Sequence, residues 1–99
     1  MRAKRRGLAR NAAIVLGNMG DPNDIPLLIS ALRDHDEPLV RGHVAWALGR
    51  IGGDRGRAIV AEAARNDPAA SVRDEAREAL DGNSGFEDLP ASIRLEVVP

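Results

Sequence analysis

The chain contains no cysteine. It therefore offers no disulfide, thiolate zinc site, iron–sulfur cluster or thiol nucleophile. Aromatic side chains are almost as scarce, because Trp46 and Phe86 are the only two among 99 residues. Alanine, leucine, isoleucine and valine must then fill the core, and an interior rich in alanine indicates helices that pack at short distances.

Long hydrophobic runs are also missing. No apolar stretch approaches the ~20 residues that a helix needs to cross a bilayer, and the longest near the start is the short run at residues 12–16. That run follows a basic segment, but it is too short for the apolar part of a signal peptide. We therefore expect a cytoplasmic chain without a membrane segment.

Residues suited to metal binding or catalysis do not form a recognisable site. In "RDHDEP", residues 33–38, His35 stands among acidic side chains. This stretch falls at an expected turn between helices, where acids cap the next helix and interact favourably with its dipole. No glycine-rich phosphate loop joins a strand to a helix. We expect no metal, no cofactor and no catalytic activity of this chain alone.

The charges are unevenly distributed, although the net charge is only −1. Residues 1–57 carry ten basic and six acidic side chains, whereas residues 58–99 carry four basic and nine acidic ones. Five of the basic residues lie among the first ten, which contain no acid. A basic end of this kind favours an anionic partner, and the alternative is an ordinary solvated surface.

An internal repeat organises the chain. "LARNAAIVLGNMG", from Leu8, aligns without gaps on "VRGHVAWALGRIG", from Val40, at an offset of 32, and "VRDEAREAL", from Val72, follows at the same offset. Three copies at a constant offset indicate stacked helical repeats. In the first two copies, apolar residues recur at the spacing of one helix face, which makes positions 8, 12, 15, 16 and 40, 44, 47, 48 the expected core.

The spacing predicts an all-α fold, a short α-solenoid of stacked helical hairpins. Proline in the first turn and glycine after the last turn mark the helix ends. The five expected helices cover about residues 3–18, 24–34, 37–51, 55–66 and 68–81. We expect one domain at residues 1–81, and a tail at residues 82–99 that is irregular or disordered.

The segment from Asp36 to Gly49, with Val40-Arg41 and Ala47-Leu48-Gly49, resembles the short HEAT-like repeats named after phycobilisome lyases. "KRRGLARNAAIVLGNMGD" followed by "IPLLISALRDHDEPLVRGHVAWALGRIGG" is similar to the C-terminal HEAT-like domain of epoxyqueuosine reductases. This resemblance covers residues 4 to about 81. Those enzymes complete the queuosine modification in the tRNA anticodon loop, so the resemblance implies an accessory surface that helps to bind tRNA. Their cobalamin-binding and cysteine-rich ferredoxin-like parts have no counterpart in this sequence.

The polar side of the second helix in each pair is the candidate binding surface. In a HEAT stack these helices line the concave face, where arginine can hold phosphates and tryptophan or histidine can stack on unpaired bases. The candidate RNA-binding residues are Arg2, Lys4, Arg5, Arg6, Arg10, Asn11, His43, Trp46 and Arg50.

Each candidate also has a structural interpretation. Trp46 aligns with Ile14 and could pack in the core, and His43 aligns with Asn11 and could be a plain surface residue. Arg41, which recurs as Arg73, is expected to brace a neighbouring turn through an acid such as Asp36 rather than to contact RNA. The basic start could be a frayed, solvated helix end.

Two functions remain open from the sequence. The first is a non-catalytic tRNA-binding module that contacts the anticodon arm. The second is an adaptor that binds a protein partner on its concave face, a common use of short HEAT-like stacks. Because the terminal repeats of a solenoid need capping, a homodimer through the exposed repeat ends is a further expectation.

Overall fold

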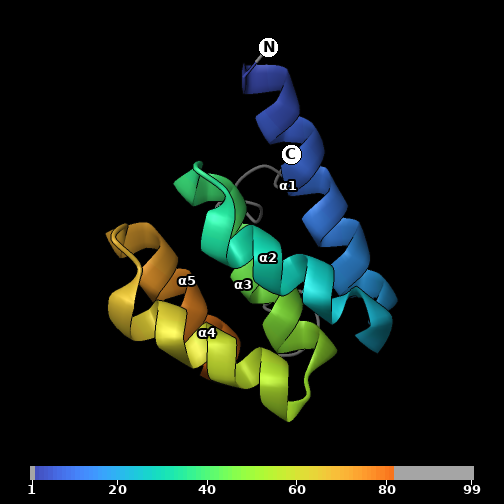
Figure 1. Cartoon of the computed structure of the whole chain (residues 1–99), viewed down its shortest axis with the longest axis vertical. Coiled ribbons are helices and arrows are strands. Elements are labelled where there is room, and N and C mark those ends of the chain that lie inside the picture. Colours follow the sequence, from blue (N-terminus) through green and yellow to red (C-terminus); the bar gives the residue numbers. More distant parts are fainter. Residues whose placement is uncertain (1, 82–99) are drawn as a thin grey trace, which may run out of the picture.

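The computed structural model describes residues 2–81, with side chains from residue 9 onward. The tail at residues 82–99 lies outside the described residues. Over the described part the chain is all-α and contains no strand (Figure 1). The elements are α1 (Arg2–Met19), the 3₁₀ helix η1 (Pro22–Asp24), α2 (Ile25–Asp34), α3 (Pro38–Ile51), α4 (Asp54–Asn66) and α5 (Ala70–Asp81).

Proline and glycine mark most of the helix ends as predicted. Pro26 and Pro38 lie in the first turns of α2 and α3, where the helix needs no backbone donor. Gly52 and Gly53 separate α3 from α4 with φ of 84° and 88°, a region that other residues rarely adopt. The last helix begins at Ala70 rather than at residue 68, because the residues before it form a turn.

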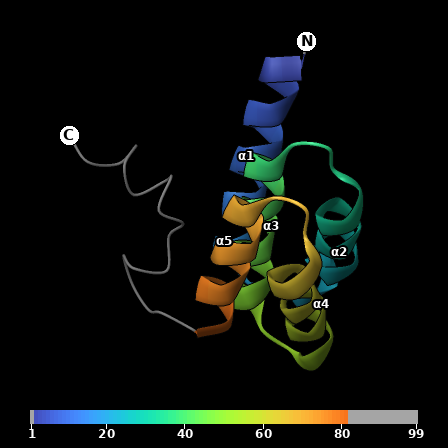
Figure 2. The same ribbon diagram turned by 90° about the vertical axis from the view of Figure 1, so that its left-hand side faces the viewer.

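The helices form two layers. Figure 2 shows α1, α3 and α5 side by side in one layer, while α2 and α4 form the other. Within the described chain, α3 is the central element and packs against all four other α-helices. Each hairpin therefore rests on the next, and the predicted short α-solenoid is confirmed.

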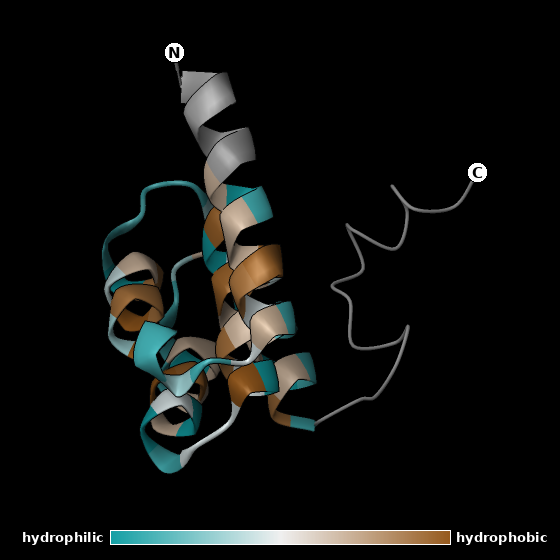
Figure 3. Ribbon diagram, turned by 90° about the vertical axis from the view of Figure 1, so that its right-hand side faces the viewer, coloured by the Kyte–Doolittle hydropathy of each residue, from teal (hydrophilic) through white to brown (hydrophobic). Residues whose placement is uncertain are grey.

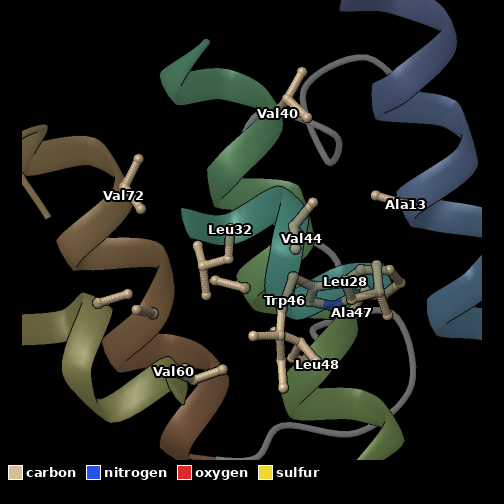
Figure 4. Packing of buried hydrophobic residues seen from close by; sticks show 14 of the residues in the cluster. Ala13, Leu28, Leu32, Val40, Val44, Trp46, Ala47, Leu48, Val60 and Val72 are labelled. Atoms are coloured by element: carbon tan, nitrogen blue, oxygen red, sulfur yellow. The ribbon is translucent and has the colours of Figure 1, made fainter. Parts of the chain in front are cut away.

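The core lies around α3, which is buried from Val40 to Leu48 (Figure 4). Small residues let neighbouring helices of the inner layer approach closely, as the composition predicts. A Cβ atom on Gly49 would lie 2.8 Å from the Cβ of Ala79 in α5. A Cβ atom on Gly17, the repeat equivalent of Gly49, would lie 2.7 Å from the Trp46 ring. In both copies, the glycine at this position of the repeat therefore forms the contact to the next inner helix.

The expected core of α1 is only partly correct. Ala12 and Val15 are exposed, although their repeat equivalents Val44 and Ala47 are buried. Ala47 is covered by α1, because a Cβ atom on Gly17 would lie 3.1 Å from its Cβ, whereas no described helix covers the corresponding side of α1 at Val15. Figure 3, which looks onto α1, shows hydrophobic residues along the described part of its ribbon. Leu8 lies outside the residues whose side chains are described.

Candidate binding surface of the inner helices

Arg41 is a buried structural residue. Its Nε and Nη2 atoms donate to the two carboxylate oxygens of Asp67, both at 3.0 Å, and its Nη1 donates to the His35 carbonyl at 2.9 Å. The acid that Arg41 contacts is therefore Asp67 of the following repeat, and not Asp36 as expected. This bidentate pair ties the loop before α3 to the loop before α5, and it leaves Arg41 unavailable to an external ligand.

Asp67 organises the loop that it occupies. Its Oδ1 atom also accepts a hydrogen bond from the Ala69 N–H at 2.9 Å, and its backbone carbonyl accepts one from Arg73 Nη1 at 2.7 Å. Arg73 thus repeats the contact that Arg41 makes with the His35 carbonyl, 32 residues earlier. Burial raises the pKa of Asp67, but the hydrogen bonds from Arg41 and Ala69 and the positive charges of Arg41 and Arg73 hold this pKa below its usual 3.8.

The depressed pKa of Asp67 predicts a loss of stability in acid. A carboxylate whose pKa is lower in the folded than in the unfolded chain stabilises the fold above pH ~4, and this contribution is lost as the pH falls through the folded pKa. Urea unfolding at pH 7, 5, 4 and 3 should show the free energy of unfolding declining over the acidic steps. Because other carboxylates also titrate there, Asp67→Asn is the control, and its decline should be shallower. Equal declines would contradict the assignment to Asp67.

Two of the predicted RNA contacts are wrong. His43 is only 1% exposed and Trp46 only 6%, so neither can stack on a base. The Trp46 ring packs against Gly17 of α1, and the His43 Nδ1 atom lies 2.7 Å from the carbonyl oxygen of Leu39. The Trp46 side chain lies on the side of α3 that α1 covers. The alignment of Trp46 with Ile14 was the sequence signal for this packing.

The remaining candidates do not form one cluster. Asn11 is exposed and Arg10 is half-buried on α1, while Arg50 is exposed in the last turn of α3. That end of α3 lies at the opposite end of the layer from the start of α1 (Figure 2). Arg2, Lys4, Arg5 and Arg6 lie within the α1 backbone, but their side chains are outside the described residues.

The inner face of α3 itself offers little surface. A Cβ atom on Gly42 would lie 3.3 Å from Cγ of Glu75, so α5 reaches over this side of α3. A shallow groove lies instead on the outer layer between α2 and α4. Its lining residues are Leu32, Arg33, Ile59, Glu62, Ala63, Asn66 and Asp67.

The described residues contain neither a cluster of metal-binding side chains nor a helix that could span a membrane. Histidine and acidic side chains do not gather there in a group of three that could hold a metal ion. In the same part of the chain, each helix is too short or too polar to cross a membrane.

Comparison with known families decides the classification. A family model described as HEAT repeats matches residues 2–81. The chain belongs to the HEAT-repeat family. This match covers all five helices of the stack, so the family accounts for the whole described fold. No solved structure matches the chain.

Two groups of curated proteins resemble this HEAT-repeat chain. Epoxyqueuosine reductase of Bacillus cereus is 44% identical over 50 residues, which are 50% of this chain and 13% of that protein. Epoxyqueuosine reductase of Listeria monocytogenes is 32% identical over 71 residues, 72% of this chain and 19% of that protein. Deoxyhypusine hydroxylase-B of Oryza sativa is 35% identical over 99 residues, 93% of this chain and 33% of that protein. The chain spans a third or less of the length of these relatives.

Proposed function

We propose that this HEAT-repeat chain is a non-catalytic RNA-binding module, and that its ligand is the anticodon arm of a tRNA. One observation carries the proposal. The first ten residues hold five cations and no acid, and nine of these residues form the start of α1. These first turns of α1 extend beyond the other helices of the stack (Figure 2), which leaves room for a large ligand.

The electrostatics of the helix favour an anion at this place. The N-terminal end of a helix carries a partial positive charge, which adds to the charges of Arg2, Lys4, Arg5 and Arg6. Cations of this kind bind the phosphate backbone without regard to base sequence. The burial of Trp46 and His43 removes the expected base-stacking contacts. We therefore propose recognition of backbone and shape rather than of single bases.

The choice of tRNA rests on the resemblance to epoxyqueuosine reductases, which is only part of the comparison. Deoxyhypusine hydroxylases match the same chain, and their name does not indicate an RNA ligand. Both groups are similar in sequence to this chain, and this chain belongs to the HEAT-repeat family. We accordingly propose that the chain binds tRNA, as an accessory domain of a reductase would, and that it carries out no catalytic step.

A salt titration tests the RNA proposal. We expect the full chain to bind a labelled anticodon stem-loop of a queuosine-type tRNA, with an affinity that falls steeply as salt rises. Replacing Arg5 and Arg6 by alanine should lower the slope of log affinity against log salt by about 1.4–1.8, because two phosphate contacts are lost. Fluorescence anisotropy at four salt concentrations measures both quantities.

The matched control removes two cations elsewhere. Arg55 and Arg65 are exposed on α4, in the outer layer, and their double alanine variant has the same net charge as the Arg5 and Arg6 variant. It should keep the affinity and slope of the unchanged chain. If both variants lose the same affinity, the effect is one of net charge and the proposed surface is wrong. An unrelated hairpin that binds as tightly would remove the tRNA assignment and leave general RNA binding.

Protein binding is the second candidate function. It is favoured by the exposed apolar residues of α1 and α2, which a nucleic acid would not cover. A protein ligand on these residues should bind independently of Arg5 and Arg6, which separates the two functions.

A further inference from the structure

The large apolar residues that are exposed lie at one end of the stack. Among the described residues they are Val15 at 54% exposure, Met19 at 69% and Leu27 at 62%. Val15 and Met19 belong to α1, and Leu27 belongs to the neighbouring α2. Apolar side chains that gather in this way on a small protein often mark an interaction surface.

The repeat shows what covers the α1 residues elsewhere. Adding 32 to Ala12 and Val15 gives Val44 and Ala47 in α3, which are 2% and 0% exposed. Ala47 lies against α1, because a Cβ atom on Gly17 would lie 3.1 Å from the Cβ of Ala47, and Ala79 of α5 lies in the same way against Gly49 of α3. The side of α1 that carries Val15 is therefore the side that the preceding inner helix covers in the other repeats.

The α2 residues lead to the same place independently. Leu27 and Ala31 have Ile59 and Ala63 of α4 as their repeat equivalents. Ile59 and Ala63 line the groove between α4 and α2, so this side of α4 faces the preceding outer helix. The corresponding side of α2 must then face the position of an outer helix before it, and that position also lies along α1.

We propose that this apolar strip, formed by Ala12, Val15 and Met19 of α1 with Leu27 and Ala31 of α2, binds α1 of a second copy of this chain, antiparallel and about a two-fold axis near Val15. The pairing places the partner helix over Val15, as α1 lies over the equivalent Ala47 of α3. In a dimer with two-fold symmetry, the strip of one copy contacts the same strip of the other copy, so no second binding surface is needed.

The pattern of α1 fits this role. Ala12, Val15, Leu16 and Met19 follow the spacing i, i+3, i+4, i+7. The apolar residues with which α2 covers α3 have the same spacing, at Ile25, Leu28, Ile29 and Leu32. The helix that is exposed on one side therefore presents the apolar pattern that an outer helix uses.

The charges favour the antiparallel direction. Residues 11–20 contain no charged side chain. The basic first turns of α1 precede this segment, and Asp21 and Asp24 follow it. Antiparallel pairing brings the basic end of one copy toward the acidic end of the other, whereas parallel pairing would bring like charges together. The proposed dimer does not depend on RNA binding, because the strip lies in the second half of α1 and in α2.

Oligomeric state tests the proposal. In sedimentation equilibrium on the full chain, we expect the mean mass to rise with concentration from 10.6 kDa toward twice that value. Val15→Asp should lower the association constant at least tenfold, because the dimer would bury an unpaired charge. Ala58→Asp, at an exposed position of α4, is the control and should associate like the unchanged chain. Far-UV circular dichroism checks that both variants are folded.

The absence of native cysteine permits a second, geometric test. Val15→Cys should form a disulfide-linked dimer under mild oxidation, because the two side chains would meet at the axis. Ala58→Cys should not cross-link above the level of random collision. A chain that stays monomeric at every concentration, with equal cross-linking of the two variants, would overturn the second copy as the occupant of the strip.

Discussion

Replacing Asp67 by alanine is expected to lower the free energy of unfolding by about 3–5 kcal/mol. The substitution would leave the Arg41 guanidinium buried between two loops without its bidentate partner, and it would also remove the acceptor of the Ala69 N–H. An uncompensated buried charge costs more than the ion pair itself contributes. Urea unfolding followed by circular dichroism measures the loss, which is large against the ~5–15 kcal/mol of a typical domain.

A matched ion pair elsewhere provides the control. Asp74 accepts from Arg77 at 2.9 Å, much like Asp67 from Arg41, but its side chain is 69% exposed and that of Asp67 only 6%. Asp74→Ala should cost less than about 1 kcal/mol, because water screens the pair. Adding Arg41→Met to Asp67→Ala should recover part of the loss, since no charge would remain buried. If the double variant is less stable than Asp67→Ala, the buried charge is not the cause.

Much of the fold could be predicted because the repeat carries several signals in each copy. The 32-residue offset, the apolar spacing within each copy and the proline and glycine positions agree with one another, and the helices follow them closely. Only the ends differ in detail. η1 forms where Asp21 accepts a hydrogen bond from the Asn23 N–H, a local contact without a periodic pattern.

The candidate surface was predicted less well, because periodicity describes one helix and not its neighbours. Trp46 and His43 fall outside the periodic apolar positions of their helix, so the pattern placed them on the surface. In the fold, the missing side chain of Gly17 lets α1 approach and cover Trp46. The partner of Arg41 was misassigned for the same reason: Asp67 lies 26 residues away in sequence, and only the stacking of hairpins brings it close.

The two ends of the stack differ in the chemistry of their exposed sides. The contact from α1 to α3 uses Gly17, and the contact from α3 to α5 uses Gly49. The residue of α5 that corresponds to Gly17 and Gly49 is Asp81, which is exposed. Asp74, about two helical turns earlier on the same side of α5, is also exposed. The outer side of α5 is therefore charged, whereas the open side of α1 is apolar. This asymmetry places the proposed self-association at the α1 end.

Replacing Leu48 by alanine is expected to cost about 2–5 kcal/mol of unfolding free energy, through lost burial and the cavity left behind. Leu48 is fully buried in α3, and its Cδ2 atom lies close to Gly56 of α4. Because α3 packs against every other α-helix of the described chain, the surroundings have little freedom to collapse into the space. Chemical denaturation of the variant measures the loss.

The repeat provides the matched comparison for this prediction. Leu80 is the equivalent of Leu48 in the last copy, but it is only partly buried at the end of α5. Leu80→Ala should cost about 1–2 kcal/mol, because less apolar area leaves water when this side chain folds. A solenoid stabilised by contacts between neighbouring repeats must lose more from its centre than from its end. Equal losses for the two variants would mean that the copies fold independently, and that α3 is not the element that joins them.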